Sequence, residues 1–172
     1  MNKIKSELIH HCLLRIEENT NKISTCLDEI LSDEIWKRPN NSSNSIGNQI
    51  LHLCGNIRQY AISSLGGQPD IRERDKEFEA NEGYSKEELL KMLNATVEKA
   101  IEIIKSINEE DLIRIRSVQG FEMSGVGILI HVTEHYSYHT GQIIFWTKLL
   151  KNKSFNFYEG TDLNKKNIPD SK

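Results

Sequence analysis

The chain has 172 residues, of which 37% are hydrophobic and 27% charged, and its formal net charge at pH 7 is −3. This length suits one domain with a sizeable core, and the composition is that of a soluble globular protein. The slightly acidic balance gives no electrostatic reason to expect nucleic acid or an anionic membrane as a partner. No run of residues approaches the roughly 18 apolar residues that a membrane span needs.

Two further features bear on the cellular compartment. The three cysteines (Cys12, Cys26 and Cys54) show no CxxC spacing, so we expect neither a disulfide framework nor a zinc ribbon. The first residues carry glutamates inside an apolar pattern and lack a small-residue cleavage site. This pattern argues against a signal peptide and predicts a cytoplasmic protein.

The first half of the chain predicts two helices. Apolar residues at spacings of three, four and seven predict one long helix over residues 3–31. A loop rich in Asn and Ser follows, in which Ser43 or Asn44 is expected to cap a second helix. This helix should run to about Leu65, because a pair of glycines comes directly after it.

The middle of the chain predicts a connector and a third helix. Residues 68–84 are polar and lack clear periodicity, and the segment is longer than most loops inside compact domains. We therefore expect it to help form a site. Ser85 and Glu88 have the spacing of a capping box, which predicts a helix from there to about Ile107.

The last third predicts an extended piece, a fourth helix and a tail. Apolar and polar residues alternate before Gly120, which favours a short extended segment or hairpin with a turn at this glycine. Ser124 is expected to cap a helix that reaches about Leu150. Four long helices predict an all-α, up-down four-helix bundle over residues 1–150, followed by a polar tail over residues 151–172.

The second helix has an unusual polar face. Arg58 is its only charged residue between Ser45 and Leu65. At 100° per residue, one side of the helix carries a stripe that is polar but uncharged, formed by Ser45, Gln49, His52, Asn56 and Gln59. Solvated faces usually carry Lys and Glu, so this stripe is either a hydrogen-bonded seam in the bundle or one side of a site.

The fourth helix carries three histidines, His131, His135 and His139, at intervals of four residues. Residues four apart share a face and lie about 6 Å apart, so two imidazoles at this spacing can bind one ion. The outer two are about 12 Å apart along the axis, so either the first pair or the second pair binds it. Together with a histidine from another helix, such a pair suits Zn, Ni, Cu or Fe.

These residues also carry a family resemblance. Leu51-His52-Leu53, combined with His135-x-x-x-His139-x-Gly141-Gln142-Ile143, resembles the DinB-like metalloenzyme superfamily. The segment over residues 44–59 and the connector with Asp70, Arg72, Arg74, Asp75, Glu77 and Phe78 are similar to one branch of it. The resemblance extends from about Leu8 to Leu150.

The resemblance implies a four-helix bundle, often dimeric, with three histidine ligands, which fall here on His52, His135 and His139. His131 lies outside this triad and is kept as a pocket residue. The superfamily includes thiol transferases that use bacillithiol or mycothiol, and a maleylpyruvate isomerase. For this chain it implies one divalent transition-metal ion, with zinc or nickel as the first candidates.

From these observations we expect a metal-dependent thiol S-transferase, with a small thiol and an electrophile as partners and a homodimer as the assembly. Gln142 is expected to orient a ligand histidine, and Asn56 and Tyr138 to line the pocket. Arg58, Arg72 and Arg74 are candidates for binding a carboxylate of the thiol, although each also suits an ordinary surface ion pair. The alternatives are a metal-dependent hydrolase and a non-catalytic, metal-binding dimer of a stress response.

Overall fold

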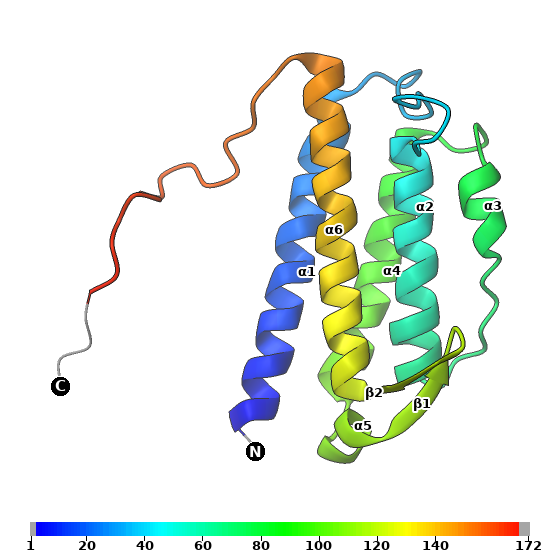
Figure 1. The fold of residues 1–172 in the computed structure, drawn as a ribbon, viewed down its shortest axis with the longest axis vertical. Helices are drawn as coiled ribbons and strands as arrows, with labels where there is room; N and C mark the ends of the chain where they lie inside the picture. The colour runs from blue at the N-terminus through cyan, green and yellow to red at the C-terminus, as the bar shows by residue number, and fades with distance from the viewer. Residues whose placement is uncertain (1–2, 169–172) are drawn as a thin grey trace.

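Four long helices pack side by side in the computed structural model, which describes residues 3–168 (Figure 1). They are α1 (Lys3–Glu29), α2 (Ile46–Ile57) with its continuation η1 (Arg58–Leu65), α4 (Lys86–Ser106) and α6 (Gly125–Lys151). Helix α6 lies beside α1 on one side and α2 on the other, and α4 packs against α1 and α2. The expected all-α four-helix bundle is therefore confirmed.

Two of the expected helix starts are confirmed in atomic detail. The Ser85 hydroxyl accepts a hydrogen bond from the backbone N–H of Glu88, and the Glu88 carboxylate accepts one from the backbone N–H of Ser85. This is the capping box that the sequence predicts for α4. At the start of α6, the Ser124 hydroxyl accepts a hydrogen bond from the Gly127 N–H.

The start of α2 differs from the prediction. The helix is capped by Ser45, not by Ser43 or Asn44. Ser45 forms a reciprocal capping box with Asn48, because the Ser45 Oγ accepts from the Asn48 N–H and the Asn48 Oδ1 accepts from the Ser45 N–H. Asn is not the usual third residue of this motif, which is why the pattern of the sequence does not identify it.

Helix α2 continues into η1 without a break, and the last eight residues adopt the wider π-helical winding. The helix ends at Gly66, and Gly67 follows with φ +66°. This is a left-handed conformation that glycine adopts without strain, so the expected closure by the two glycines is confirmed.

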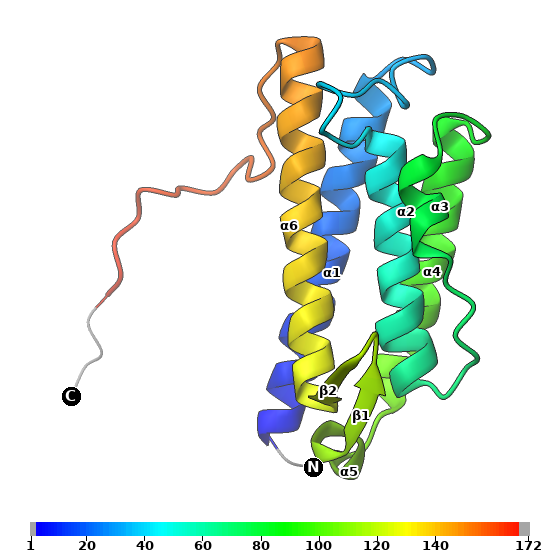
Figure 2. The same cartoon turned by 45° about the vertical axis from the view of Figure 1, so that its right-hand side comes forward.

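The connector contains one element that its sequence did not predict, the short helix α3 (Arg74–Glu79). Figures 1 and 2 show α3 outside the four-helix bundle, alongside α2. The Asn48 amide ties it there by donating to the backbone carbonyls of Glu77 and Ala80, at 2.9 and 2.6 Å. The same asparagine thus completes the capping box of α2 and holds the connector against this helix.

A β-hairpin closes one end of the bundle (Figure 2). Its strands β1 (Ile115–Val118) and β2 (Phe121–Ser124) are antiparallel, and Ile115 pairs with Ser124. Gln119 and Gly120 both have positive φ, as a two-residue hairpin turn requires. The expected turn at Gly120 is confirmed, whereas the short helix α5 (Glu109–Ile113) before β1 was not predicted.

The core consists of aliphatic residues from all four long helices and includes the three cysteines. The segment after α6 folds back toward α1, where Phe155 and Phe157 are partly buried and Lys22 donates a hydrogen bond to the Tyr158 hydroxyl. Within residues 3–168, no helix is both long enough and apolar enough to span a membrane.

Candidate metal centre

Three imidazole rings from two helices converge between α2 and α6. His52 comes from α2, and His135 and His139 come from α6. The Nε2 atoms of His52 and His135 lie 2.9 Å apart, and one ligand atom from each of the three rings lies within 4.8 Å of the other two. Of the two pairs that the spacing on α6 left open, His135 and His139 are therefore the ones that meet His52.

His52 is oriented by a carboxylate from the connector. Its Nδ1 lies 2.8 Å from Oε2 of Glu77, and both side chains are buried. A carboxylate oxygen only accepts, so this contact places the proton of the neutral ring on Nδ1. The lone pair is then on Nε2, the atom that faces His135, and this arrangement is typical of metal-ligating histidines.

Glu77 is held in turn by Arg72. The guanidinium donates through Nε to Oε1 of Glu77 at 2.7 Å and through NH2 to Oε2 at 2.9 Å, which is bidentate pairing. Its NH1 donates to the Gln59 amide oxygen at 2.9 Å, and its side chain is only 2% exposed. Burial alone would raise the pKa of Glu77, but the hydrogen bonds from Arg72 and His52 outweigh it and keep this pKa below its usual value.

His139 is oriented by an amide pair that bridges α2 and α6. Its Nδ1 donates to the Gln49 amide oxygen, and the Gln49 amide nitrogen donates to the Gln142 oxygen at 2.6 Å. The lone pair of His139 is therefore also on Nε2. The sequence predicts that Gln142 orients a ligand histidine. In the structure Gln49 makes the direct hydrogen bond to His139, and Gln142 is bonded to Gln49.

Burial keeps the histidines of α6 in their neutral form. Burial first, and then the neighbouring rings of His139 and His52, lower the pKa of His135 to about 3. Burial, followed by the proximity of His52, lowers the pKa of His139 to about 4. Neutral imidazole is the form that binds a metal ion, so both rings are ready to bind at neutral pH.

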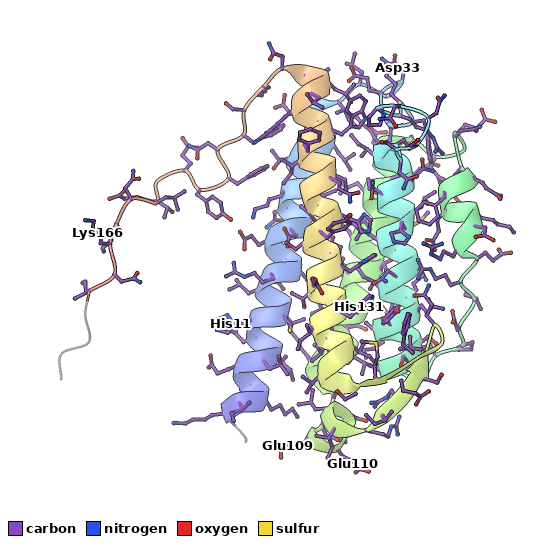
Figure 3. The ribbon with its side chains drawn as sticks, viewed as in Figure 1. His11, Asp33, Glu109, Glu110, His131 and Lys166 are labelled. Atoms are coloured by element: carbon purple, nitrogen blue, oxygen red, sulfur yellow. The ribbon has the colours of Figure 1, made fainter. Side chains whose placement is uncertain are left out.

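His131 lies next to this group without joining it. Its ring stacks on Tyr60 at 4.0 Å between centroids and on His135 at 5.3 Å, and its Nε2 is 3.1 Å from the Asn56 amide nitrogen. Figure 3 shows His131 in the space between α6 and α2, toward the hairpin end. Asn56 and His131 therefore form the polar layer next to the three converging rings.

The remaining expected site residues lie around the centre at different depths. Tyr138 is exposed, and its ring packs edge-on against His139 with 5.0 Å between centroids. The Arg74 guanidinium lies 4.8 Å from the centroid of the Phe78 ring, which itself lies against His52. Arg58 lines a cavity of about 700 Å³ between α2, α4 and the connector, which we call the connector cavity. Arg72 and Glu77 line this cavity as well.

The fold has known relatives. The chain superposes on a DinB-like protein, YjoA, from Bacillus subtilis with a TM-score of 0.66 and 19% identity, over 86% of this chain and 96% of that one. A DinB-like protein from Bacillus cereus gives a TM-score of 0.64 and 15% identity, over 82% and 91% of the two chains. The fold is therefore DinB-like. No curated protein matches the chain.

Sequence comparison gives the family. Residues 3–159 match the family DUF1572, which is described as "Protein of unknown function". The chain belongs to this family. The match covers all four long helices and the connector, so every residue of the DUF1572 centre described above lies inside it.

The donor set of this DUF1572 chain fits a transition-metal ion. Zinc with Zn–N bonds of about 2.0–2.1 Å separates tetrahedral ligand atoms by about 3.4 Å. The observed separations, from 2.9 Å to at most 4.8 Å, bracket that value. Three neutral nitrogen donors suit zinc, nickel, copper or iron, and three protein ligands leave a position open for another molecule.

Sequence reasoning missed two residues that orient the ligands, Glu77 and Gln49. Gln49 belongs to the uncharged stripe of the second helix, but the stripe does not reveal which ring it contacts. Glu77 belongs to a charged connector that looks like a solvated loop. The sequence does offer a signal at Gly55, one turn after His52, because a glycine inside a helix costs stability and can mark a place where another group packs against the backbone.

Proposed function

We propose that this protein binds one divalent transition-metal ion, zinc or nickel, through His52, His135 and His139 and acts as a metal-dependent thiol S-transferase. The observation that carries the proposal is that ring nitrogens of His52, His135 and His139 converge within 4.8 Å of one another, while hydrogen bonds at Nδ1 leave Nε2 of His52 and of His139 unprotonated. A divalent ion bound there supplies Lewis acidity that lowers the pKa of a thiol or water at its open position.

The residues of the chain prepare this position in two ways. Glu77 and Gln49 fix two of the rings, so that little reorganisation is needed when an ion binds. Arg72 neutralises the charge of Glu77, the buried carboxylate that contacts His52. The centre is therefore suited to gain a negative ligand such as a thiolate.

The thiol must come from outside the chain. All three cysteines are buried. Burial raises the pKa of Cys26 to about 11 and that of Cys54 to about 12. At neutral pH such thiols are inert, because the thiolate is the nucleophile. A small thiol molecule is thus the nucleophile that this proposal requires.

The reaction is a substitution at carbon. The thiol loses its proton to solvent, and its sulfur forms a new C–S bond with the electrophilic carbon. The bond from that carbon to the leaving group breaks at the same time, and the leaving group departs with its electron pair. The products are a thioether and the released anion.

A hydrolase would use water in place of the thiol, and it is the less favoured reading for a structural reason. Water attack at such a centre is usually assisted by a nearby general base. Within residues 3–168 the group of potential metal ligands contains no carboxylate, and Glu77 is already committed to Arg72 and to the far side of His52.

A conjugation assay tests the proposal. Protein loaded with zinc or nickel is incubated with 1-chloro-2,4-dinitrobenzene and one of a panel of thiols, and thioether formation is followed by absorbance. We expect conjugation above the uncatalysed rate with at least one thiol. It should be lost in His135→Ala and retained in His11→Ala, which removes an exposed histidine of α1 (Figure 3).

The same samples distinguish the alternatives. If the protein hydrolyses esters or amides but forms no thioether, it is a hydrolase and not a transferase. The metal-loaded protein could instead be inactive with every thiol and ester, yet unfold at a lower temperature when a chelator is added. That result would support a non-catalytic metal-binding role instead of the transferase.

A further inference from the structure

A second cavity, of about 720 Å³, lies directly beside the metal centre. Its walls are the loop over residues 39–44, the start of α2 with Ile46 and Gln49, and the part of α6 from Tyr138 to Leu149. We call it the α6 cavity. Its volume is within the range of about 300–1,000 Å³ that is typical of small-molecule sites.

The α6 cavity has no charged residue in its lining. It combines three aromatic side chains, Tyr138, Phe145 and Trp146, with hydroxyl and amide groups from the loop. The connector cavity differs sharply, since both acidic and basic side chains line it. An ionised group entering the α6 cavity would lose water without gaining an opposite charge, which is costly.

The α6 cavity adjoins the metal centre. Gln49 and Gln142 both line it, and Gln49 accepts the hydrogen bond from His139. Tyr138 lines it as well, with its ring against His139. None of the three converging histidines lines the cavity itself, but its wall includes the amide pair and the Tyr138 ring, so a molecule bound in it lies next to His139.

Resting on the proposed function, we infer that the α6 cavity binds the electrophile and selects one whose body is uncharged and aromatic or otherwise apolar. The thiol is the less suitable occupant, because small biological thiols carry carboxylate and ammonium groups. Large exposed apolar side chains on one face mark a binding surface, and Phe145 is 65% and Tyr138 63% exposed. The loop hydroxyls and amides can orient one or two polar atoms of the bound molecule.

Gly141 offers a way to fill the α6 cavity without disturbing the helix. It lines the cavity, and a β-carbon built on it meets no atom within 4 Å. Gly141→Leu should therefore fold and place an isobutyl group where the ligand binds. Ser137→Leu adds a similar side chain at an exposed position one turn earlier that does not line the cavity, and it is the matched control.

A pair of dyes tests the inference independently of catalysis. Binding of uncharged N-phenyl-1-naphthylamine and of its charged analogue 8-anilinonaphthalene-1-sulfonate is measured by fluorescence on metal-free and metal-loaded protein. We expect the uncharged dye to bind the wild type and Ser137→Leu equally, and Gly141→Leu at least tenfold more weakly. For the sulfonated dye, the factor by which Gly141→Leu weakens binding should be at least tenfold smaller than for the uncharged dye.

Several outcomes would overturn the inference. One is equal binding of the uncharged dye to wild type and Gly141→Leu, and another is an equal effect of Gly141→Leu on both dyes. A change in oligomeric state in Gly141→Leu, measured by light scattering, would instead make this face a contact between two copies. Phe145→Ser, which removes an exposed aromatic wall, provides the same test if Gly141→Leu does not fold. Dye binding requires neither a metal ion nor catalytic turnover. The dye experiment therefore tests the cavity even if the proposed metal centre proves wrong.

Discussion

The carboxylate of Glu77 lies where a side chain on Gly55 would have to be. A β-carbon built on Gly55 would overlap Oε1 of Glu77 and would lie 3.0 Å from Nε of Arg72. The glycine in α2 thus admits the connector to the helix surface, one turn after His52. This close approach is what brings Glu77 within hydrogen-bond distance of His52.

Gly55→Ala should therefore displace Glu77 and weaken metal binding. Loss of a group that orients a ligand typically costs about 10–100-fold in metal affinity, and we expect a loss in this range by titration calorimetry. Gly141→Ala in α6 is the control, since its new methyl group meets nothing. That variant should keep its affinity and gain about 0.5–1 kcal/mol in the free energy of unfolding. Equal affinities in the two variants would contradict the role of Gly55.

Glu77→Gln separates the ion pair from the fold of the connector. The change keeps the shape of the side chain but leaves the guanidinium of Arg72 buried without a counter-charge. Removing one member of a buried pair costs about 3–5 kcal/mol in the free energy of unfolding, and metal affinity should fall as well. Urea denaturation and calorimetry measure the two effects.

Glu73→Gln is the matched control for that variant. Glu73, at the start of α3, forms an ion pair with Lys76 of the same helix. Both of these side chains are mostly exposed, unlike those of Glu77 and Arg72. Such surface pairs contribute about 0–1 kcal/mol. A loss in Glu73→Gln as large as that in Glu77→Gln would mean that the connector is sensitive to any change of charge.

His131→Ala should leave metal binding stoichiometric. His131 stacks on Tyr60 and its Nε2 accepts a hydrogen bond from the Asn56 amide nitrogen, but it does not belong to the group of three converging histidines. We expect one ion per chain in this variant, with a lower melting temperature because the stack between Tyr60 and His135 is lost. A sample of His131→Ala that retains no metal would place this residue among the ligands.

The cysteines should react only when the protein unfolds. Unfolded thiols have a pKa near 9, whereas burial raises the pKa of Cys26 to about 11 and that of Cys54 to about 12. The folded state therefore disfavours both thiolates, and this contribution to stability is complete below pH 9. It is lost as the pH rises toward 11 for Cys26 and toward 12 for Cys54. Labelling with a disulfide reagent at pH 8 should be slow in buffer and rapid in urea. Rapid labelling of the native protein would contradict the burial of these thiols.

Much of the fold could be predicted from local sequence patterns. The capping box at Ser85, the cap at Ser124 and the turn at Gly120 are short-range signals, and each is confirmed. The helices α3 and α5 were missed because elements of 6 and 5 residues show no full period of hydrophobicity. The cap of α2 was misplaced because Asn48 replaces the usual acidic partner.

The site could be predicted only in part, for a different reason. The spacing on α6 limits the candidates to two pairs of histidines, and the family resemblance selects His135 and His139. The packing of α6 on α2 brings this pair to His52. The contact between His52 and Glu77 joins residues 25 positions apart. In sequence Glu77 looks like any charged residue of a polar connector, so its burial against Arg72 could not be foreseen.

Elemental analysis of untagged protein tests the central claim most directly. Wild type and His11→Ala are compared with His52→Ala, His135→Ala and His139→Ala after loading with zinc or nickel and removal of excess ion. The three-histidine centre predicts one ion per chain in the first two proteins and a clear loss of bound metal in each of the other three, with all five proteins folded by circular dichroism. Wild-type protein without stoichiometric metal, or a folded His52→Ala variant that keeps all of it, would contradict the account.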